Sequence, residues 1–131
     1  MDFIDKLIKL EEHIAAEKGG FVLFAVVQRE DASNRWDLLL SAPWFGSEEK
    51  ATLDFIVSKI KETLTPQEMV MLSRIILFPP TDPRVDEIRQ RIQSPVQHGH
   101  VELSAWTLAG MPVSHAHIVT AAGEPVSVRV L

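Results

Sequence analysis

Two His-x-His pairs near the carboxyl end of the chain carry its sharpest chemical signal. Four of the five histidines lie in the stretch HGHVELSAWTLAGMPVSHAHIV, residues 98–119. The pairs are His98 with His100 and His115 with His117. Because strand side chains alternate between two faces, each pair on a strand would present both imidazoles on one face, about 7 Å apart. Two such rings can bind one zinc ion through nitrogen atoms at about 2.0 Å.

The apolar pattern of this stretch predicts a β-hairpin in a particular register. With a two-residue turn at 109–110, Val101 faces Ile118 and Leu103 faces Ala116, which gives the hairpin one apolar face. A four-residue loop would keep that face, whereas a three-residue loop would break it. The apolar pattern therefore favours an even number of loop residues.

The other face of this hairpin would gather imidazoles around a carboxylate. In the two-residue register, Glu102 lies opposite His117, and Ser104 lies opposite His115. His100 lies diagonal to His117, so the patch resembles a two-histidine, one-carboxylate metal site. His98 begins the first strand, far from the turn end, and is not expected to share the ion. The candidate metal ligands are His100, Glu102, His115 and His117.

A solvated hairpin face is nevertheless the interpretation that the sequence favours. Any polar strand face can carry this pattern, with rings that stack and form ordinary hydrogen bonds beside Trp106. A metal site also needs an enclosing pocket and side chains that orient the ligands. The sequence therefore predicts no cofactor, with a divalent metal such as zinc as the alternative.

No complete catalytic motif accompanies the histidines. Ser41 lacks the flanking glycines of the nucleophile elbow G-x-S-x-G. Neither glycine-rich phosphate-binding motif occurs, and a chain without cysteine has no thiolate nucleophile. We therefore predict no catalytic residues and favour a protein that is not an enzyme.

Asp37 is a carboxylate within the otherwise apolar segment RWDLLLSA. Carboxylates near the first predicted hairpin could also belong to an active site, because perturbed carboxylates mark both active sites and structural ion pairs. We favour a buried ion pair, because a buried carboxylate needs a partner. The candidate partners are Arg29, Arg35 and Arg74.

Composition and charge limit the classes of partner. The chain has 131 residues, with 46% hydrophobic and 24% charged residues, which is typical of one globular domain, 1–131. A net charge of −5 argues against a nucleic-acid partner, which would require a basic face. The start MDFIDKLIKLEEH is not typical of a signal peptide, and no apolar run is long enough to span a membrane. We expect a cytoplasmic protein with neither a nucleic acid nor a membrane as partner.

Hydrophobic periodicity and turn residues predict an α+β fold on a mostly antiparallel sheet of about five or six strands, with helices packed against it. A capping box, Thr65 with Glu68, begins a short helix, and glycine or proline residues end most elements. The order is α-β-β-α-α-β-α-β-β-β. The expected elements are a helix after Asp2 up to Gly19, strands 21–28 and 35–42, a helix from 47 to 64, a short helix from 65 to about 72, a strand at 74–78, a helix from 82 to about 93, and strands 98–108, 113–121 and 125–131.

A binding or regulatory domain that acts through protein contacts, as a homodimer, is the function that the sequence favours. The first helix has a wide apolar stripe, and Trp44 and Phe45 follow a strand end. There these aromatic residues either cover the core, which is the commoner outcome, or anchor an interface. The first alternative is a metal-dependent enzyme or metal-binding protein that uses the histidine-rich hairpin.

A small-ligand sensor is the second alternative. The order of two strands, then helices, then three strands resembles that of PAS-type sensor domains, although the predicted strand RIILF lies where that fold has helices. The resemblance concerns element order alone and implies a ligand cavity between sheet and helices. An enclosed cavity lined by Phe24, Trp36 and Trp106 would favour this function.

Overall fold

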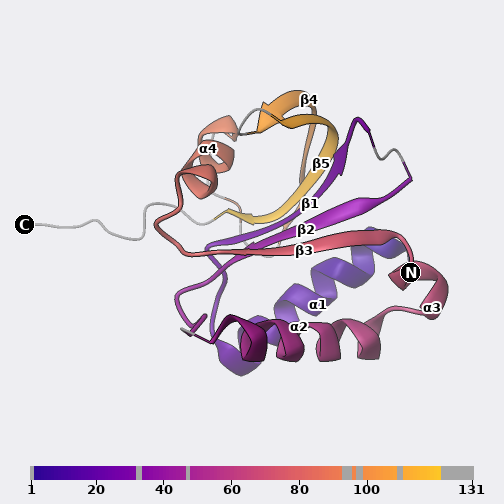
Figure 1. Cartoon of the computed structure of the whole chain (residues 1–131), viewed down its shortest axis with the longest axis vertical. Coiled ribbons are helices and arrows are strands. Elements are labelled where there is room, and N and C mark those ends of the chain that lie inside the picture. The colour runs from indigo at the N-terminus through magenta and orange to yellow at the C-terminus, as the bar shows by residue number, and fades with distance from the viewer. Residues whose placement is uncertain are drawn as a thin grey trace, which may run out of the picture.

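A mixed β-sheet has helices packed against both of its faces (Figure 1). The computed structural model describes residues 2–31, 34–46, 48–92, 96, 99–108 and 111–121, with only the backbone of residues 105 and 106. The elements are α1 (Phe3–Lys18), β1 (Leu23–Arg29), β2 (Trp36–Ser41), α2 (Glu49–Thr63), α3 (Pro66–Met69), β3 (Leu72–Phe78), α4 (Pro83–Arg91), β4 (Val101–Leu108) and β5 (Met111–Ala121). The predicted α+β class and element order are confirmed. The expected strand 125–131 lies outside the described residues.

The five described strands are arranged in the order β3-β2-β1-β5-β4. The neighbours β2–β1, β1–β5 and β5–β4 run antiparallel, whereas β2 and β3 run parallel. A parallel pair needs a long crossover connection, which α2 and α3 supply. The sheet is therefore mostly antiparallel, with one parallel pair at the β3 edge.

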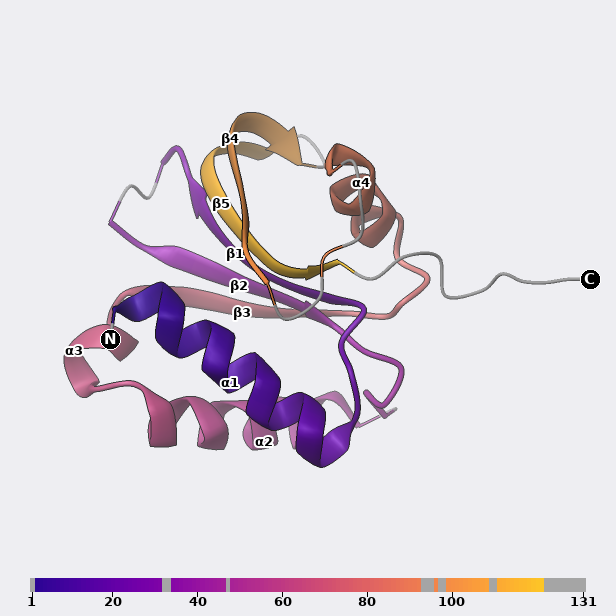
Figure 2. The ribbon, with the colours of Figure 1, turned by 180° about the vertical axis from the view of Figure 1, so that it is seen from behind.

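The helices cover both faces of the sheet. Two views show α1 and α2 beneath one face and α4 against the other, where β4 and β5 curl toward it (Figures 1 and 2). Alternate strand residues supply the two apolar layers, so that Phe24 and Val26 of β1 face α1 and α2, while Ala25 and Val27 face α4. Both faces of the central strands are buried under helices or other strands. Consecutive residues of β1 are therefore apolar.

Local signals in the sequence set the helix ends. Asp2 caps α1 by accepting a hydrogen bond from the amide of Asp5 at 2.9 Å. The helix ends at Lys18 and is followed by the cap residue Gly19, whose φ of 117° lies in the left-handed region that favours glycine. The capping box at Thr65 and Glu68 is confirmed, with hydrogen bonds in both directions.

The short third helix ends earlier than its sequence predicts. The apolar run after the capping box favoured a helix to about Leu72, but α3 ends at Met69 and β3 already begins at Leu72. Pairing with β2 explains the difference, because the amide of Trp36 donates to the carbonyl of Met71 at 2.7 Å. Sheet pairing over long range here overrides the local helical pattern.

Trp44 and Phe45 belong to an aromatic cluster beside the end of α1. The Trp44 ring lies edge-to-face with Phe21, Phe45 and Phe55, at centroid distances of 5.6, 4.8 and 6.2 Å. Its indole also donates to the carbonyl of Gly19 at 2.8 Å. Both residues are half-buried, so much of their apolar surface already lies against the chain itself.

None of the helices in the described part of the chain combines the length and the apolar character needed to cross a membrane.

Candidate metal centre

The C-terminal hairpin adopts the register that its apolar pattern predicts. Val101 pairs with Ile118 and Leu103 with Ala116 on the face toward α4, and the final pair, Leu108 with Met111, leaves two residues for the turn. Those two residues lie outside the described part of the chain. The register is therefore confirmed from the paired strands.

The opposite face carries the histidines. Glu102 pairs with His117, and Ser104 pairs with His115. His117 also pairs with Val26 on the central strand β1, so its ring lies on the side of the sheet that α1 covers. The candidate ligands of the hairpin therefore lie on the same face of the sheet as α1.

Three candidate ligand atoms surround one point. His100 Nε2 and His117 Nδ1 share a hydrogen bond of 2.6 Å. Glu102 Oε2 lies 3.8 Å from the first nitrogen and 3.9 Å from the second. A point in the plane of their triangle lies about 2 Å from each atom. A tetrahedral zinc ion with bonds of about 2.0 Å needs its two nitrogens about 3.3 Å apart, so binding would replace the hydrogen bond and separate the two rings by about 0.7 Å.

His115 contacts the other oxygen of the same carboxylate. Its Nε2 lies 3.4 Å from Glu102 Oε1, and its ring centroid lies 4.9 Å from that of His117. The close ligand group in the described residues consists of His100, Glu102 and His117. His115 is thus placed to hold Glu102 in position, as outer groups commonly orient metal-binding carboxylates.

His117 is the most buried member of the group. Its side chain is 11% exposed, against 56% for Glu102. Burial lowers the pKa of His117, and the neighbouring His100 and His115 lower it further, while the carboxylates of Glu102 and Asp2 act in the opposite direction. The lowered pKa favours the neutral imidazole, which is the form that binds metal.

Trp36 completes the surroundings of His117, and the sequence interpretation did not place it there. The centroid of the Trp36 ring lies 5.3 Å from that of His117 and 6.3 Å from that of His115. Trp36 begins β2, which is separated from β5 by β1. Only the strand order brings this indole to the histidines, so no local motif could have indicated it.

Other candidate residues lie elsewhere. His98 and the Trp106 side chain are outside the described part of the structure. Phe24, expected to line a sensor's cavity, is 1% exposed within the apolar layer toward α1, whereas Trp36 lies beside the histidines. The confirmed strand β3 also occupies the region in which the PAS-type order has helices.

Asp37 forms an ion pair beneath the opposite face of the sheet. Its side chain is 2% exposed, and its Oδ2 lies 3.1 Å from Arg29 Nε and 2.6 Å from Arg74 Nη2. The hydrogen bond with Asp37 raises the pKa of Arg74. Of the three arginines considered from the sequence, Arg29 and Arg74 are the partners, while Arg35 precedes β2 and is exposed.

No family model, curated protein or solved structure shows significant similarity to the chain. The geometry of the site is therefore the basis for assigning a function.

Proposed function

We propose that this protein binds one divalent transition-metal ion through His100, Glu102 and His117. The observation that carries the proposal is the convergence of three ligand atoms, from His100, Glu102 and His117, about 2 Å from one point. This arrangement favours the metal-binding alternative over the solvated hairpin face that the sequence favoured. His115, which the sequence placed in the same patch, contacts Glu102, and Trp36 adds a contact that the sequence did not reveal.

Zinc is the ion that we expect first. Two imidazoles and one carboxylate form the protein ligand set of several catalytic zinc sites, and they leave one coordination position for water. The same set also suits iron(II) in sites with open positions. Magnesium and calcium prefer oxygen ligands, so the two nitrogen ligands argue against them.

The bound ion would hold β4, an edge strand of the described sheet, against its neighbour β5. His100 directly precedes β4 and Glu102 lies on it, whereas His117 lies on the inner strand β5. An ion held by ligands from both segments stabilises their pairing, because it binds only the folded arrangement. The ligands His100 and Glu102 are exposed on this face, which leaves the open coordination position accessible to water or another ligand.

Zinc titration of the untagged, metal-free protein tests this proposal. We expect about one equivalent to bind and to raise the melting temperature, because zinc at 100 times its dissociation constant adds about 2.7 kcal/mol to the free energy of unfolding. Binding should weaken strongly between about pH 7.5 and pH 5.5, because protons compete for the imidazole nitrogens. Calorimetry and thermal unfolding at both pH values measure the effect.

Magnesium is the matched control for that titration, because it carries the same charge but disfavours nitrogen ligands. Equal stabilisation by magnesium would indicate a general charge effect and contradict the proposed site. Absence of zinc binding at millimolar concentration would also contradict it and return the hairpin to the solvated interpretation.

A protein-contact domain remains a second proposed function. The observation that favours it is the apolar edge of β3, which pairs with no strand among the described residues other than β2, rather than Trp44 and Phe45, which pack in the aromatic cluster. A cytoplasmic location is part of both proposals, because the chain has no cysteine and disulfides are rare in that compartment.

A further inference from the structure

The strand β3 forms one edge of the sheet in the described part of the chain. It pairs with β2 on one side, and the strand order places no described strand on its other side. Strand edges present unpaired amide and carbonyl groups, and proteins commonly protect such edges with lysine or proline residues. β3 has neither within Leu72–Phe78, and the charge of its one basic residue, Arg74, is compensated by Asp37.

Apolar side chains accompany this edge on both faces of the sheet. Ile75 and Leu77 face α2, whereas Ile76 and Phe78 face α4. Ile75, Ile76 and Leu77 are only half-buried. The edge is therefore an apolar stripe that the chain itself covers incompletely.

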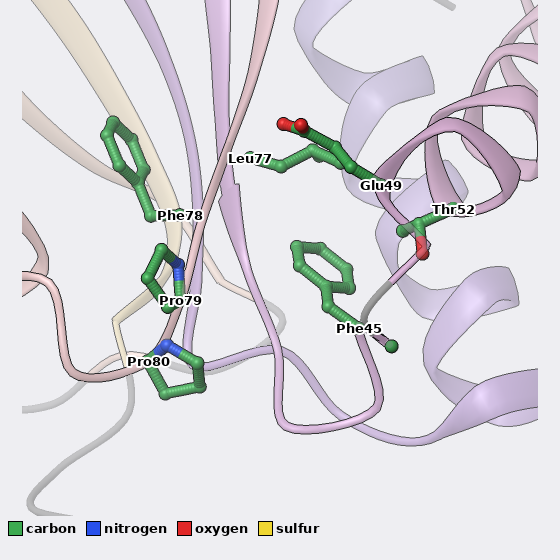
Figure 3. A pocket seen from close by; sticks show the side chains of 8 residues that line it. Phe45, Glu49, Thr52, Leu77, Phe78, Pro79 and Pro80 are labelled. Carbon is green, nitrogen blue, oxygen red and sulfur yellow. The ribbon is translucent and has the colours of Figure 1, made fainter.

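Grooves lie beside the strand along much of its length. One groove lies between α2 and the first half of β3. A second, shown in Figure 3, lies between the start of α2 and the end of β3, with Phe45 and Leu77 in its wall. A third lies on the opposite face, beside Ile76. The first groove is lined by Leu53, Val57, Ile60, Met69, Leu72, Ser73, Arg74 and Ile75.

We propose that β3 pairs antiparallel with β3 of a second copy of this chain, about a two-fold axis at Ile75. In this register Ile75 faces Ile75 of the other copy, and Ser73 faces its Leu77. Arg74 faces Ile76, so the two guanidinium groups are diagonal neighbours rather than directly opposed, and each is compensated by Asp37 of its own copy. All seven residues of the strand then take part in the pairing.

The neighbouring registers are less favourable. An axis at Arg74 would place two arginines directly opposite each other, and like charges in that position destabilise a strand pair. An axis at Ile76 would place Ser73 against Pro79, which has no N–H group to donate. The positions of Arg74 and Pro79 therefore favour the register with the two-fold axis at Ile75 over the two neighbouring registers.

The side chains that line the grooves can add to the area that paired strands bury. A standard interface buries about 800 Å² on each partner, so paired strands need flanking side chains as well. The two-fold axis would bring the α2 side of one copy next to that of the other, with half-buried Leu53 and Val57 in the wall of each groove. Closure of this seam would remove the incompletely covered apolar stripe from water.

Sedimentation equilibrium tests the self-association. We expect the unmodified chain to be a dimer, and Ile75→Lys, which opposes two cations at the axis, to raise the dissociation constant about 100-fold or more. Val70→Lys is the control, because Val70 is 64% exposed and lies outside β3. A monomeric unmodified chain at high concentration would overturn the proposal, as would an unchanged dimer in Ile75→Lys.

Single cysteines test the register even if the lysine variant folds poorly. The chain has no cysteine of its own, so a cross-link reports only the introduced residue. Opposite residues in an antiparallel pair have Cα atoms about 4.5–5.5 Å apart, within reach of a disulfide. Ile75→Cys should therefore form a disulfide-linked dimer under mild oxidation. Ser73→Cys should not, because Ser73 and its copy would be four residues apart along the strand direction.

A mixed sample provides the positive control. Ser73→Cys combined with Leu77→Cys should form the heterodimer, because these positions face each other in the proposed register. Efficient cross-linking of Ser73→Cys alone, equal to that of Ile75→Cys, would contradict the register.

Discussion

Asp37→Ala is expected to lower the free energy of unfolding by about 3–5 kcal/mol, because it removes the buried carboxylate that compensates two arginines, one of them largely buried. The carboxylate lies between Arg29 and Arg74, which approach to 3.1 and 2.6 Å. The side chain of Arg74 is 45% exposed and can turn to water, whereas that of Arg29 is 22% exposed. We therefore expect most of the loss to come from Arg29 and a value near the lower end of that range.

Asp31→Ala is the matched control, because Asp31 pairs with the same arginine at the surface. Its carboxylate lies 3.3 Å from Arg29 Nη1 with a side chain that is 76% exposed. Exposed pairs contribute about 0.2–1 kcal/mol, so this variant should remain close to the unmodified protein. Urea unfolding of both variants measures the difference that burial makes.

Asp37→Asn separates the loss of charge from the loss of volume. The amide fills the same space but no longer balances the arginines, so we expect it to be destabilised almost as much as the alanine variant. If Asp37→Ala were no more destabilising than Asp31→Ala, the structural ion pair would be wrong, and the carboxylate would again be a candidate for chemistry.

The sequence predicted the hairpin register because burial constrains it. Shifting a strand by one residue moves every side chain to the other face, and the apolar residues at 101, 103, 116 and 118 tolerate that shift poorly. Once those pairs are set, Glu102 must face His117. The candidate ligand set therefore follows from local alternation alone, and the structure brings three of its members into one group, with His115 in contact with Glu102.

The order of the strands in the sheet could not be predicted from local sequence patterns. Nothing in the segments around Trp36 and His117 indicates that one strand separates them. Asp37 had three possible arginine partners for the same reason, because the choice depends on β1 and β3 as neighbours of β2. The contact of Trp36 with the metal centre and the partners of the buried carboxylate are properties of the assembled sheet.

The wide apolar stripe of the first helix also has a different role from the one that favoured a dimer. Leu7, Leu10 and Ile14 are fully buried against the chain's own sheet. A short sequence pattern cannot distinguish an apolar face that is covered within the chain from one that is covered by a partner. Among the described residues, β3 carries apolar side chains that the chain covers incompletely, and its place at the edge of the described sheet is again set by topology.

His117→Ala is expected to lower zinc affinity by about 100-fold or more, because it removes the most buried ligand of the proposed centre. Structural zinc sites bind with about 10–16 kcal/mol in total, so one of three protein ligands contributes several kcal/mol. His115→Ala should have a smaller effect, about tenfold, because His115 contacts Glu102 Oε1 at 3.4 Å without joining the close ligand group. Calorimetric titration of untagged variants measures both effects.

His13→Ala is the control, because it removes an imidazole that lies outside the proposed metal centre. His13 is exposed on α1 and should leave zinc affinity unchanged. Circular dichroism of each metal-free variant checks that the fold persists, since His117 also packs against Trp36 at a centroid distance of 5.3 Å.

The ratio of the losses in zinc affinity of His117→Ala and His115→Ala distinguishes the possible ligand sets. A loss on His115→Ala as large as that on His117→Ala would make His115 a fourth ligand and replace the three-ligand centre with a closed one. Undiminished zinc binding by His117→Ala would be incompatible with either arrangement, because the point that is about 2 Å from the three ligand atoms exists only with His117 Nδ1 in place.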